Sequence, residues 1–234
     1  MTPILVLHGW GWPISSSQWI TVKELLEKAG YAVFLPDLPG FGKTPSPKEP
    51  WMIDDYVEWV KNFCEENNLS KIFLLGHSFG GSAAAKFSIK YPERVRKLIL
   101  VDSAGIRRKR LQKEIQKKIA HFLNHFSFLP FYGFVRKIAY RTLFRHSDYL
   151  LTEGVMKETY LKVLGEDISD IFSDISVPAL LIWGEKDGIT PLAHAYFMKE
   201  KIPGAELHII PNVRHNPHRE APGVLAEKIK EFIQ

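Results

Sequence analysis

The stretch that decides the fold is Ile72-Phe73-Leu74-Leu75-Gly76-His77-Ser78-Phe79-Gly80-Gly81-Ser82-Ala83-Ala84-Ala85. An apolar run leads into the pattern G-x-S-x-G, and small residues suited to a closely packed helix follow it. A serine on a sharp turn between strand and helix needs glycines beside it, because neighbouring chains pack against the turn. The start of the helix then directs free N–H groups toward an oxyanion. The stretch therefore predicts that Ser78 is a nucleophile.

Apolar runs of similar length recur on both sides of this stretch, at Ile4–Leu7, Tyr31–Leu35, Leu98–Val101, Ala179–Trp183 and Glu206–Ile210. Runs rich in Leu and β-branched residues are typical of strands that are buried on both faces, as in a parallel sheet covered by helices. Segments with helical periodicity lie between most of them, at Ser16–Ala29, Ile53–Asn67, Ser82–Tyr91, Pro191–Lys201 and Ala221–Phe232. This alternation predicts a doubly wound α/β fold.

One long segment interrupts the alternation, because no clear strand occurs between Val101 and Ala179. Residues 105–165 are instead aromatic-rich and helical in pattern, with 13 Lys and Arg against 4 Asp and Glu. A helical insertion between two core strands indicates a cap over the carboxyl edge of the sheet, where ligands bind in such folds. We therefore expect an α/β core formed by residues 1–104 and 166–234, with a helical cap inserted at 105–165.

A nucleophilic serine needs a base and an acid that orients the base. Two histidines, His215 and His218, follow the last predicted strand, where the loop meets the carboxyl edge of the sheet beside Ser78. Asp187 follows the penultimate strand, and Asp102 at the end of an earlier strand is the alternative acid. We predict His215 and Asp187, with His218 and Asp102 as rivals. The resulting order Ser, Asp, His is the one expected after a nucleophile turn of this kind.

An oxyanion hole requires two backbone donors. The N–H of Phe79, directly after the nucleophile, is the first candidate. The second is expected from the loop after the first strand, where we predict the N–H of Trp10, while His8 beside it is expected to be structural. The indole of Trp10 is expected to form part of the pocket wall.

The cap carries many aromatic residues, and these are expected mainly to pack it onto the core. A subset can line an apolar pocket, for which we name Phe126, Phe131 and Phe134. The basic cluster that begins at Arg107-Arg108-Lys109-Arg110 is expected to be a solvated helix face. An anionic substrate and an acidic membrane surface are the alternatives for this cluster, whereas nucleic acid is not expected, because no recognisable binding motif accompanies it.

Taken together, these segments resemble the α/β-hydrolase superfamily, in its lid-bearing branch of carboxylesterases and C–C hydrolases. Three further motifs carry the resemblance: D-x-x-G-x-G-x-S over residues 37–44 with Thr44 in the last place, G-x-x-D-x-x-x-P over 184–191, and H-x-x-x-x-E-x-P over 215–222. The last match favours His215 over His218. The resemblance covers nearly the whole chain outside the cap.

The sequence also departs from the family pattern. The family commonly has two antiparallel strands before the strand at Ile4–Leu7, so we expect a reduced sheet of about six strands. Arg214 stands where a glycine often precedes the histidine. A serine at position 78, rather than an aspartate, argues against the epoxide-hydrolase and dehalogenase relatives.

These residues predict a serine hydrolase that cleaves carboxylic esters with small to medium apolar acyl groups through an acyl-enzyme, without metal or cofactor. The same site would suit a C–C bond hydrolase, a lactonase or an amidase. A non-catalytic ligand-binding protein on the same fold is the alternative from another class. The sequence does not predict an oligomeric state.

Composition restricts the class of protein further. Hydrophobic residues make up 45% and charged residues 24%, as in ordinary globular proteins, and the net charge is +5. The single cysteine, Cys64, excludes an internal disulfide, and no Cys/His spacing typical of zinc occurs. The N-terminal residues lack the features of a signal peptide, and no apolar run is long enough to span a membrane. We expect a cytoplasmic protein, with peripheral membrane contact through the basic cap as an open possibility.

Overall fold

A parallel sheet forms the centre of the protein, in a computed structural model that describes residues 2–11, 15–107 and 153–234. Six strands occur within these residues: β1 (Ile4–Leu7), β2 (Val33–Phe34), β3 (Ile72–His77), β4 (Val95–Val101), β5 (Ala179–Gly184) and β6 (Glu206–Ile210). They are hydrogen-bonded in the order β2-β1-β3-β4-β5-β6, and every neighbouring pair is parallel. The reduced, parallel sheet expected from the sequence is confirmed.

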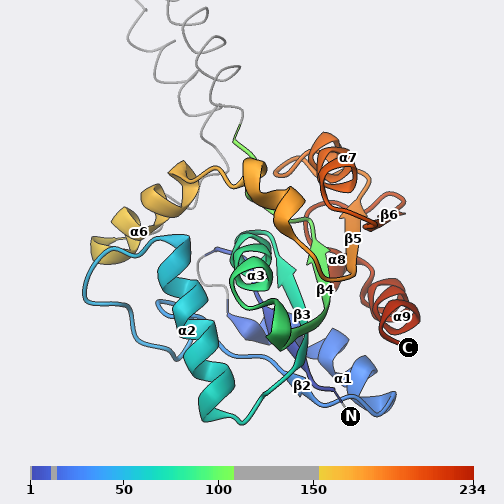
Figure 1. Ribbon diagram of the computed structural model, residues 1–234, viewed down its shortest axis with the longest axis horizontal. Coiled ribbons are helices and arrows are strands. Elements are labelled where there is room, and N and C mark those ends of the chain that lie inside the picture. Colours follow the sequence, from blue (N-terminus) through green and yellow to red (C-terminus); the bar gives the residue numbers. More distant parts are fainter. Residues whose placement is uncertain (1, 12–14, 108–152) are drawn as a thin grey trace, which may run out of the picture.

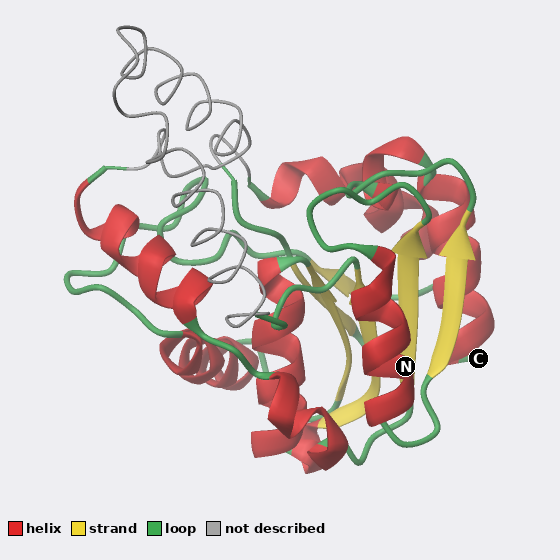
Figure 2. Ribbon diagram, turned by 90° about the horizontal axis from the view of Figure 1, so that it is seen from above, coloured by secondary structure: helices red, strands yellow, loops and turns green. Residues whose placement is uncertain are grey.

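Helices cover both faces of the sheet (Figure 2). The helices α2 (Ile53–Glu66), α3 (Phe79–Lys90) and α7 (Leu192–Lys201) share one apolar cluster with one face of the strands. The helices α1 (Ile20–Lys28) and α9 (Pro222–Ile233) share a second cluster with the opposite face, and lie together on the side away from α2 and α3 (Figure 1). Within the described ranges, short 3-10 helices lie at Ser16–Trp19, Pro92–Arg94 and Ser169–Asp174.

Alternate strand residues supply the two clusters. In β1, Leu5 and Leu7 belong to the first cluster, whereas Ile4 and Val6 belong to the second. This division follows from the pleat, which directs successive side chains to opposite faces of a strand. A strand with helices on both sides must be apolar at every position, and for this reason the strands are continuous apolar runs in the sequence.

The strand order places the carboxyl ends of β1 and β3 side by side at the centre of the sheet. The chain passes from β1 outward to β2 and then returns across β1 to β3, so the direction of winding reverses between β1 and β3. In open α/β sheets, ligands bind in the crevice beyond the carboxyl ends of the strands at such a reversal. The loop after β1 and the turn after β3 meet at this point, and these segments contain Trp10 and Ser78.

The helix after the nucleophile turn begins earlier than its Ala-rich segment alone suggested. It starts at Phe79 rather than at Ser82, because the Ser78 carbonyl accepts hydrogen bonds from Gly81 N at 2.9 Å and Ser82 N at 3.4 Å. The first turn of α3 therefore follows Ser78 directly.

The last part of the segment expected to form the cap is a helix, α6 (Gly154–Gly165), in contact with the core. Met156, Tyr160 and Val163 on this helix are buried, and Thr159 Oγ1 accepts a hydrogen bond from Trp51 N at 3.1 Å. The remainder of the expected cap, including Phe126, Phe131 and Phe134, lies outside the described residues. The division into core and cap stays a prediction.

Two expectations about the rest of the chain concern Cys64 and membrane spans. Cys64 is buried on α2 as a free thiol. None of the helices in the described ranges combines the length and apolar character that crossing a membrane requires.

Candidate active site

Ser78 lies on a strained turn between β3 and α3. Its φ of 51° and ψ of −117° fall in a region that residues other than glycine rarely adopt. The Ser78 N–H donates to the Val101 carbonyl at 3.1 Å, which fixes the turn against β4. A side chain at Gly80 would overlap with the carbonyl oxygen of Leu7 in β1. The glycines of the motif therefore let three chain segments meet at the serine.

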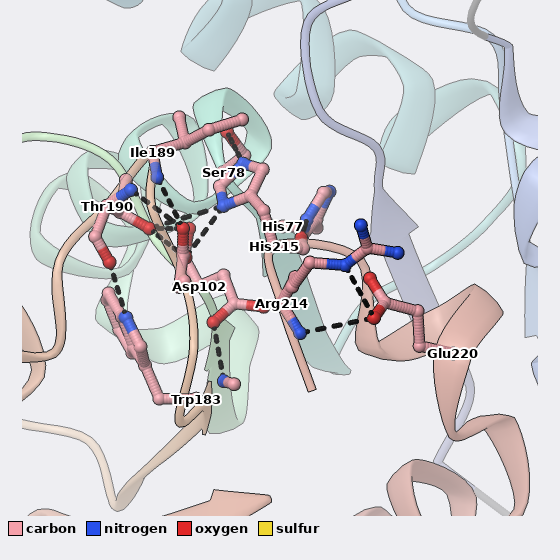
Figure 3. Close-up of polar contacts among 11 residues, drawn as sticks. His77, Ser78, Asp102, Trp183, Ile189, Thr190, Arg214, His215 and Glu220 are labelled. Atoms are coloured by element: carbon pink, nitrogen blue, oxygen red, sulfur yellow. Dashed lines mark hydrogen bonds and ion pairs between the residues drawn. The ribbon is translucent and has the colours of Figure 1, made fainter. Parts of the chain in front are cut away.

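A chain of hydrogen bonds joins Ser78, His215 and Asp187 (Figure 3). Asp187 Oδ2 accepts from His215 Nδ1 at 2.7 Å. A proton on Nδ1 leaves Nε2 of a neutral imidazole as an acceptor, and Ser78 Oγ lies 3.0 Å from this nitrogen. The structure thus brings together three residues from the loops after β3, β5 and β6, in the arrangement needed to withdraw a proton from Ser78.

Several donors keep the Asp187 side chain ionised. Its oxygens accept hydrogen bonds from Thr190 Oγ1 at 2.6 Å, Thr190 N at 3.0 Å and Ile189 N at 2.7 Å. Burial by itself would raise the pKa of Asp187, but the hydrogen bond and charge of His215, together with Thr190 and Ile189, hold this pKa below its ordinary value. An ionised Asp187 can stabilise a protonated His215.

The loop that carries His215 is held by His77, the residue before the nucleophile. His77 Nε2 donates to the His215 carbonyl at 2.8 Å. Burial, together with the nearby His218 and His215, lowers the pKa of His77 well below its ordinary value, so this ring is a neutral donor. The sequence analysis did not assign a role to His77 or Thr190, although both lie within the motifs that identified Ser78 and Asp187.

The two rival residues have other contacts. The His218 ring stacks on Trp19 with centroids 4.5 Å apart, and burial lowers the pKa of His218 to about 3. Asp102 Oδ1 accepts a hydrogen bond from Gly184 N at 2.8 Å rather than from a histidine. In the described structure only His215, of these two histidines, is hydrogen-bonded to Ser78, and only Asp187, of the two acids, is hydrogen-bonded to His215.

The predicted oxyanion donors lie next to Ser78 with free N–H groups. Phe79 is the first residue of α3, where N–H groups have no partner within the helix. Among the hydrogen bonds of the described residues, none has Phe79 N or Trp10 N as its donor. The rings of these two residues are in edge-to-face contact, with centroids 5.3 Å apart.

The sequence matches a known family. A family model described as alpha/beta hydrolase fold matches residues 2–222. The chain belongs to the α/β-hydrolase fold family. As an α/β hydrolase it is 28% identical to Lipase 1 of Psychrobacter immobilis, over 98% of this chain and 76% of the relative. It is 26% identical to the 2-hydroxy-6-oxononadienedioate/2-hydroxy-6-oxononatrienedioate hydrolase of Escherichia coli, over 98% of this chain and 86% of the relative.

A solved structure gives the same assignment at the level of the fold. A thermophilic esterase from Thermogutta terrifontis superposes on this α/β hydrolase with a TM-score of 0.73 and 26% sequence identity. The match covers 100% of this chain and 89% of that chain.

A cavity of about 160 Å³ opens beside Ser78 of this α/β hydrolase. Ser78 and His215 line one side of it, together with Trp10 and Phe79. Tyr160 and Val163 of α6 line another part, and the Trp10 and Tyr160 ring centroids lie 5.2 Å apart. Trp10 is thus among the residues that line this cavity.

Two loop residues, His8 after β1 and Asp37 after β2, are hydrogen-bonded to the backbone around them. His8 is buried with both ring nitrogens engaged, because Nδ1 donates to the Gly9 carbonyl at 2.8 Å and Nε2 accepts from Leu38 N at 3.0 Å. Asp37 accepts from Ser16 N at 2.7 Å and from Lys43 N at 3.0 Å, which closes the turn over residues 37–44. Both residues act as structural supports for this part of the α/β hydrolase.

Arg214, which replaces a common glycine, is directed away from the nucleophile (Figure 3). Its Nε pairs with Glu220 Oε2 at 3.2 Å, and its side chain is 75% exposed. Glu220, the acidic residue of the H-x-x-x-x-E-x-P motif, therefore fixes the side chain of Arg214, which precedes His215.

Potential metal ligands gather at one place among the described residues. Ligand atoms of His77, Asp102 and His215 lie within 4.8 Å of one another. His215 uses both of its ring nitrogens toward Ser78 and Asp187, and His77 uses Nε2 toward a carbonyl. These atoms already have partners in the hydrogen-bond chain, so the donor set favours proton transfer over metal coordination.

Proposed function

We propose that this α/β hydrolase cleaves carboxylic esters by nucleophilic catalysis at Ser78. The observation that carries the proposal is the continuous hydrogen-bond chain from Asp187 through His215 to Ser78 Oγ. A serine hydroxyl is a weak nucleophile until a base accepts its proton, and His215 Nε2 lies within reach of that proton.

The reaction would proceed in two halves. Ser78 Oγ attacks the ester carbonyl while His215 takes its proton, and His215 then passes this proton to the departing alkoxide, which leaves an acyl-enzyme. Water, deprotonated by His215, attacks the acyl-enzyme, and the carboxylic acid leaves as Ser78 regains its proton. The N–H groups of Phe79 and Trp10 would bind the oxyanion in both halves, and Asp187 would hold the imidazole and stabilise its charge.

The cavity supports an acyl group of small to medium size with an apolar chain. Its volume of about 160 Å³ is modest, and Trp10, Tyr160 and Val163 contribute apolar surface to its wall. Relatives named as lipase and esterase support the choice of an ester as the substrate class.

Hydrolysis of p-nitrophenyl esters of increasing acyl length tests the proposal. We expect the wild-type protein to show a maximum at one chain length, and Ser78→Ala to lose turnover by a factor on the order of 10⁴ or more. His215→Gln and Asp187→Asn are expected to lose turnover as well. The matched controls are His218→Gln and Asp102→Asn, which leave the hydrogen-bond chain in place and are expected to retain most activity when folded.

Absence of turnover at every acyl length in a folded wild-type protein would contradict ester hydrolysis. A second candidate, hydrolysis of a C–C bond, is favoured by the similarity to the Escherichia coli enzyme named above. Turnover of a vinylogous diketone that depends on Ser78, in the absence of ester turnover, would establish this second function.

A further inference from the structure

A cationic side chain without an ion partner lies in the wall of the candidate active-site cavity. Arg107 lines the cavity together with Ser78 and Tyr160. Its Nε is buried and has no hydrogen-bond partner among the described residues. Within residues 2–11, 15–107 and 153–234, no carboxylate forms an ion pair with the Arg107 guanidinium. A buried charge without a partner is costly, so such a group is rarely retained without a ligand or partner.

The acidic residues near Arg107 are occupied by other groups. Glu166, which also lines the cavity, accepts from Lys86 Nζ at 2.6 Å and from Ile53 N at 3.3 Å. Asp167 accepts from two backbone groups, Arg107 N at 3.0 Å and Ser169 N at 3.0 Å. Asp167 thus fixes the backbone of Arg107, and among the described residues it forms no ion pair with the guanidinium.

The protonation of Arg107 is consistent with an anion-binding role. Burial lowers the pKa of Arg107, while Tyr160 and Asp167 oppose this effect. An arginine remains charged in such surroundings, because its ordinary pKa lies far above neutral pH. A negative group in the cavity would therefore restore the electrostatic stabilisation that burial removes.

We propose that Arg107 binds a carboxylate of the substrate, so that the ester cleaved at Ser78 also carries an acidic group. This inference rests on the ester hydrolysis proposed above and specifies its substrate class. The guanidinium presents a planar fork of donors that matches the two oxygens of a carboxylate. Apolar residues of the cavity lining, such as Trp10 and Val163, would contact the carbon chain that joins the carboxylate to the ester.

The charges around the cavity favour a carboxylate over a phosphate. Arg107 supplies one positive charge, which one carboxylate balances. A phosphate ester with about two negative charges would leave one of them without a matching cation, close to the carboxylates of Glu166 and Asp167. Lys86 is engaged by Glu166 and by Asp54, which lies 2.7 Å away, and so offers no second free cation.

A structural role is the alternative for Arg107, since residues 108–152 contain two acidic residues, Glu114 and Asp148. An ion pair with one of them would make Arg107 important for stability but not for the choice of substrate. The test must therefore compare substrates as well as variants.

The experiment compares anionic esters with neutral esters of matched length. On the acyl side, monomethyl succinate, glutarate and adipate are compared with the methyl esters of the corresponding unbranched monocarboxylic acids. On the alcohol side, acetyl esters of ω-hydroxy acids are compared with acetyl esters of simple alcohols. In one of these two series, we expect the wild type to hydrolyse the anionic ester with a higher kcat/KM than the matched neutral ester. Arg107→Gln is expected to reduce kcat/KM for that anionic ester about 10- to 100-fold.

The neutral esters and a second variant serve as controls. Arg107→Gln is expected to leave kcat/KM for neutral esters nearly unchanged. Arg94→Gln removes a positive charge that pairs with Glu65 at the opposite end of β4, and it is expected to leave the preference for anionic esters intact. The same ratio of anionic to neutral turnover in wild type and Arg107→Gln would overturn the proposal, as would a stability loss without any change in this ratio.

A binding measurement separates this proposal from ester hydrolysis itself. Calorimetric titration of Ser78→Ala with glutarate and adipate requires no turnover. Binding that is lost when Arg107→Gln is added would support the carboxylate site even if no ester were hydrolysed. Absence of binding, together with normal turnover of neutral esters, would overturn the carboxylate site and leave ester hydrolysis standing.

Discussion

At the scale of single residues, the most unusual acid beside the site is Asp102. It is fully buried at the end of β4 and has a φ of 42°. Burial raises the pKa of Asp102 to about 9, the Gly184 N–H opposes the rise, and the neighbouring Asp187 and Glu220 add to it. Oδ2 of Asp102, as a carboxylate oxygen, has no donor among the described residues. With a proton on Oδ2, the Asp102 side chain would be a hydrogen-bond donor. The rings of His77 and His215 nearby are hydrogen-bonded to other groups.

This pKa predicts that Asp102 makes the stability of the protein depend on pH. Between the ordinary pKa of 3.8 and about 9 the unfolded chain is ionised at this position while the native protein retains the proton. The free energy of unfolding should therefore fall as pH rises, by as much as about 1.4 kcal/mol per pH unit from this residue. Asp102→Asn cannot titrate, so urea unfolding should show this variant gaining stability relative to the wild type between pH 5 and pH 8.

The pH dependence of the stability difference between Asp102→Asn and the wild type tests this prediction. A difference in stability that stays constant with pH would show that Asp102 is ionised in the native protein. Asp187→Asn is the comparison variant, because the pKa of Asp187 is held below its ordinary value of 3.8. The stability that ionised Asp187 contributes should be lost as pH falls below that value, and it should not change between pH 5 and pH 8.

At the scale of secondary-structure elements, the nucleophile turn depends on how closely β1, β3 and α3 approach one another. Gly80 lies in the first turn of α3, where an added side chain would overlap with the Leu7 and His8 carbonyl oxygens. Both oxygens belong to the backbone at the end of β1, which cannot move without separating α3 from β1. The requirement for glycine at this position is therefore steric.

Gly80→Ala is expected to destabilise the protein by about 2–4 kcal/mol, as for overpacking at a rigid core site. It is also expected to lower ester turnover, because Ser78 would be displaced with the start of α3. Gly188→Ala is the matched control, since nothing lies within 4 Å of a side chain added there. Thermal unfolding of the two variants tests the prediction, and equal melting temperatures would contradict it.

At the scale of the whole molecule, one group of charges connects parts of the chain that are distant in sequence. Lys86 on α3 lies 2.7 Å from Asp54 on α2 and 2.6 Å from Glu166, just after α6. Glu166 also accepts from Ile53 N at the start of α2. This group joins α2, α3 and the return from the expected cap, and it lies at the wall of the candidate active-site cavity.

Lys86→Gln is expected to destabilise the protein by about 1–3 kcal/mol, because it leaves the largely buried Glu166 carboxylate without its cation. Lys90→Gln, one helical turn further along α3, removes an ion pair with Glu58 in which both side chains are about half exposed. This control is expected to lose much less stability than Lys86→Gln, because water screens an exposed ion pair. Urea unfolding at neutral pH measures both values, and equal losses would show that the Lys86 group contributes no more than a surface pair.

The sequence by itself determined the strands, most of the helices and the nucleophile turn. Each of these depends on local properties: continuous apolar runs for buried parallel strands, spaced apolar residues for helices, and glycines around Ser78. Local pattern could not locate the start of α3 at Phe79, because that start depends on the conformation of Ser78.

Tertiary structure decided which candidates meet. His215 and His218 are three residues apart, and pattern alone left both in one loop. In the structure His215 is hydrogen-bonded to Ser78, 137 residues away, whereas the His218 ring stacks on the Trp19 ring. Likewise Asp187, rather than Asp102, is hydrogen-bonded to His215 in the structure, a contact that depends on the order of the parallel strands. The exposure and partners of Arg107 likewise follow from packing. Contacts between distant residues depend on how the elements assemble, which the local sequence does not encode.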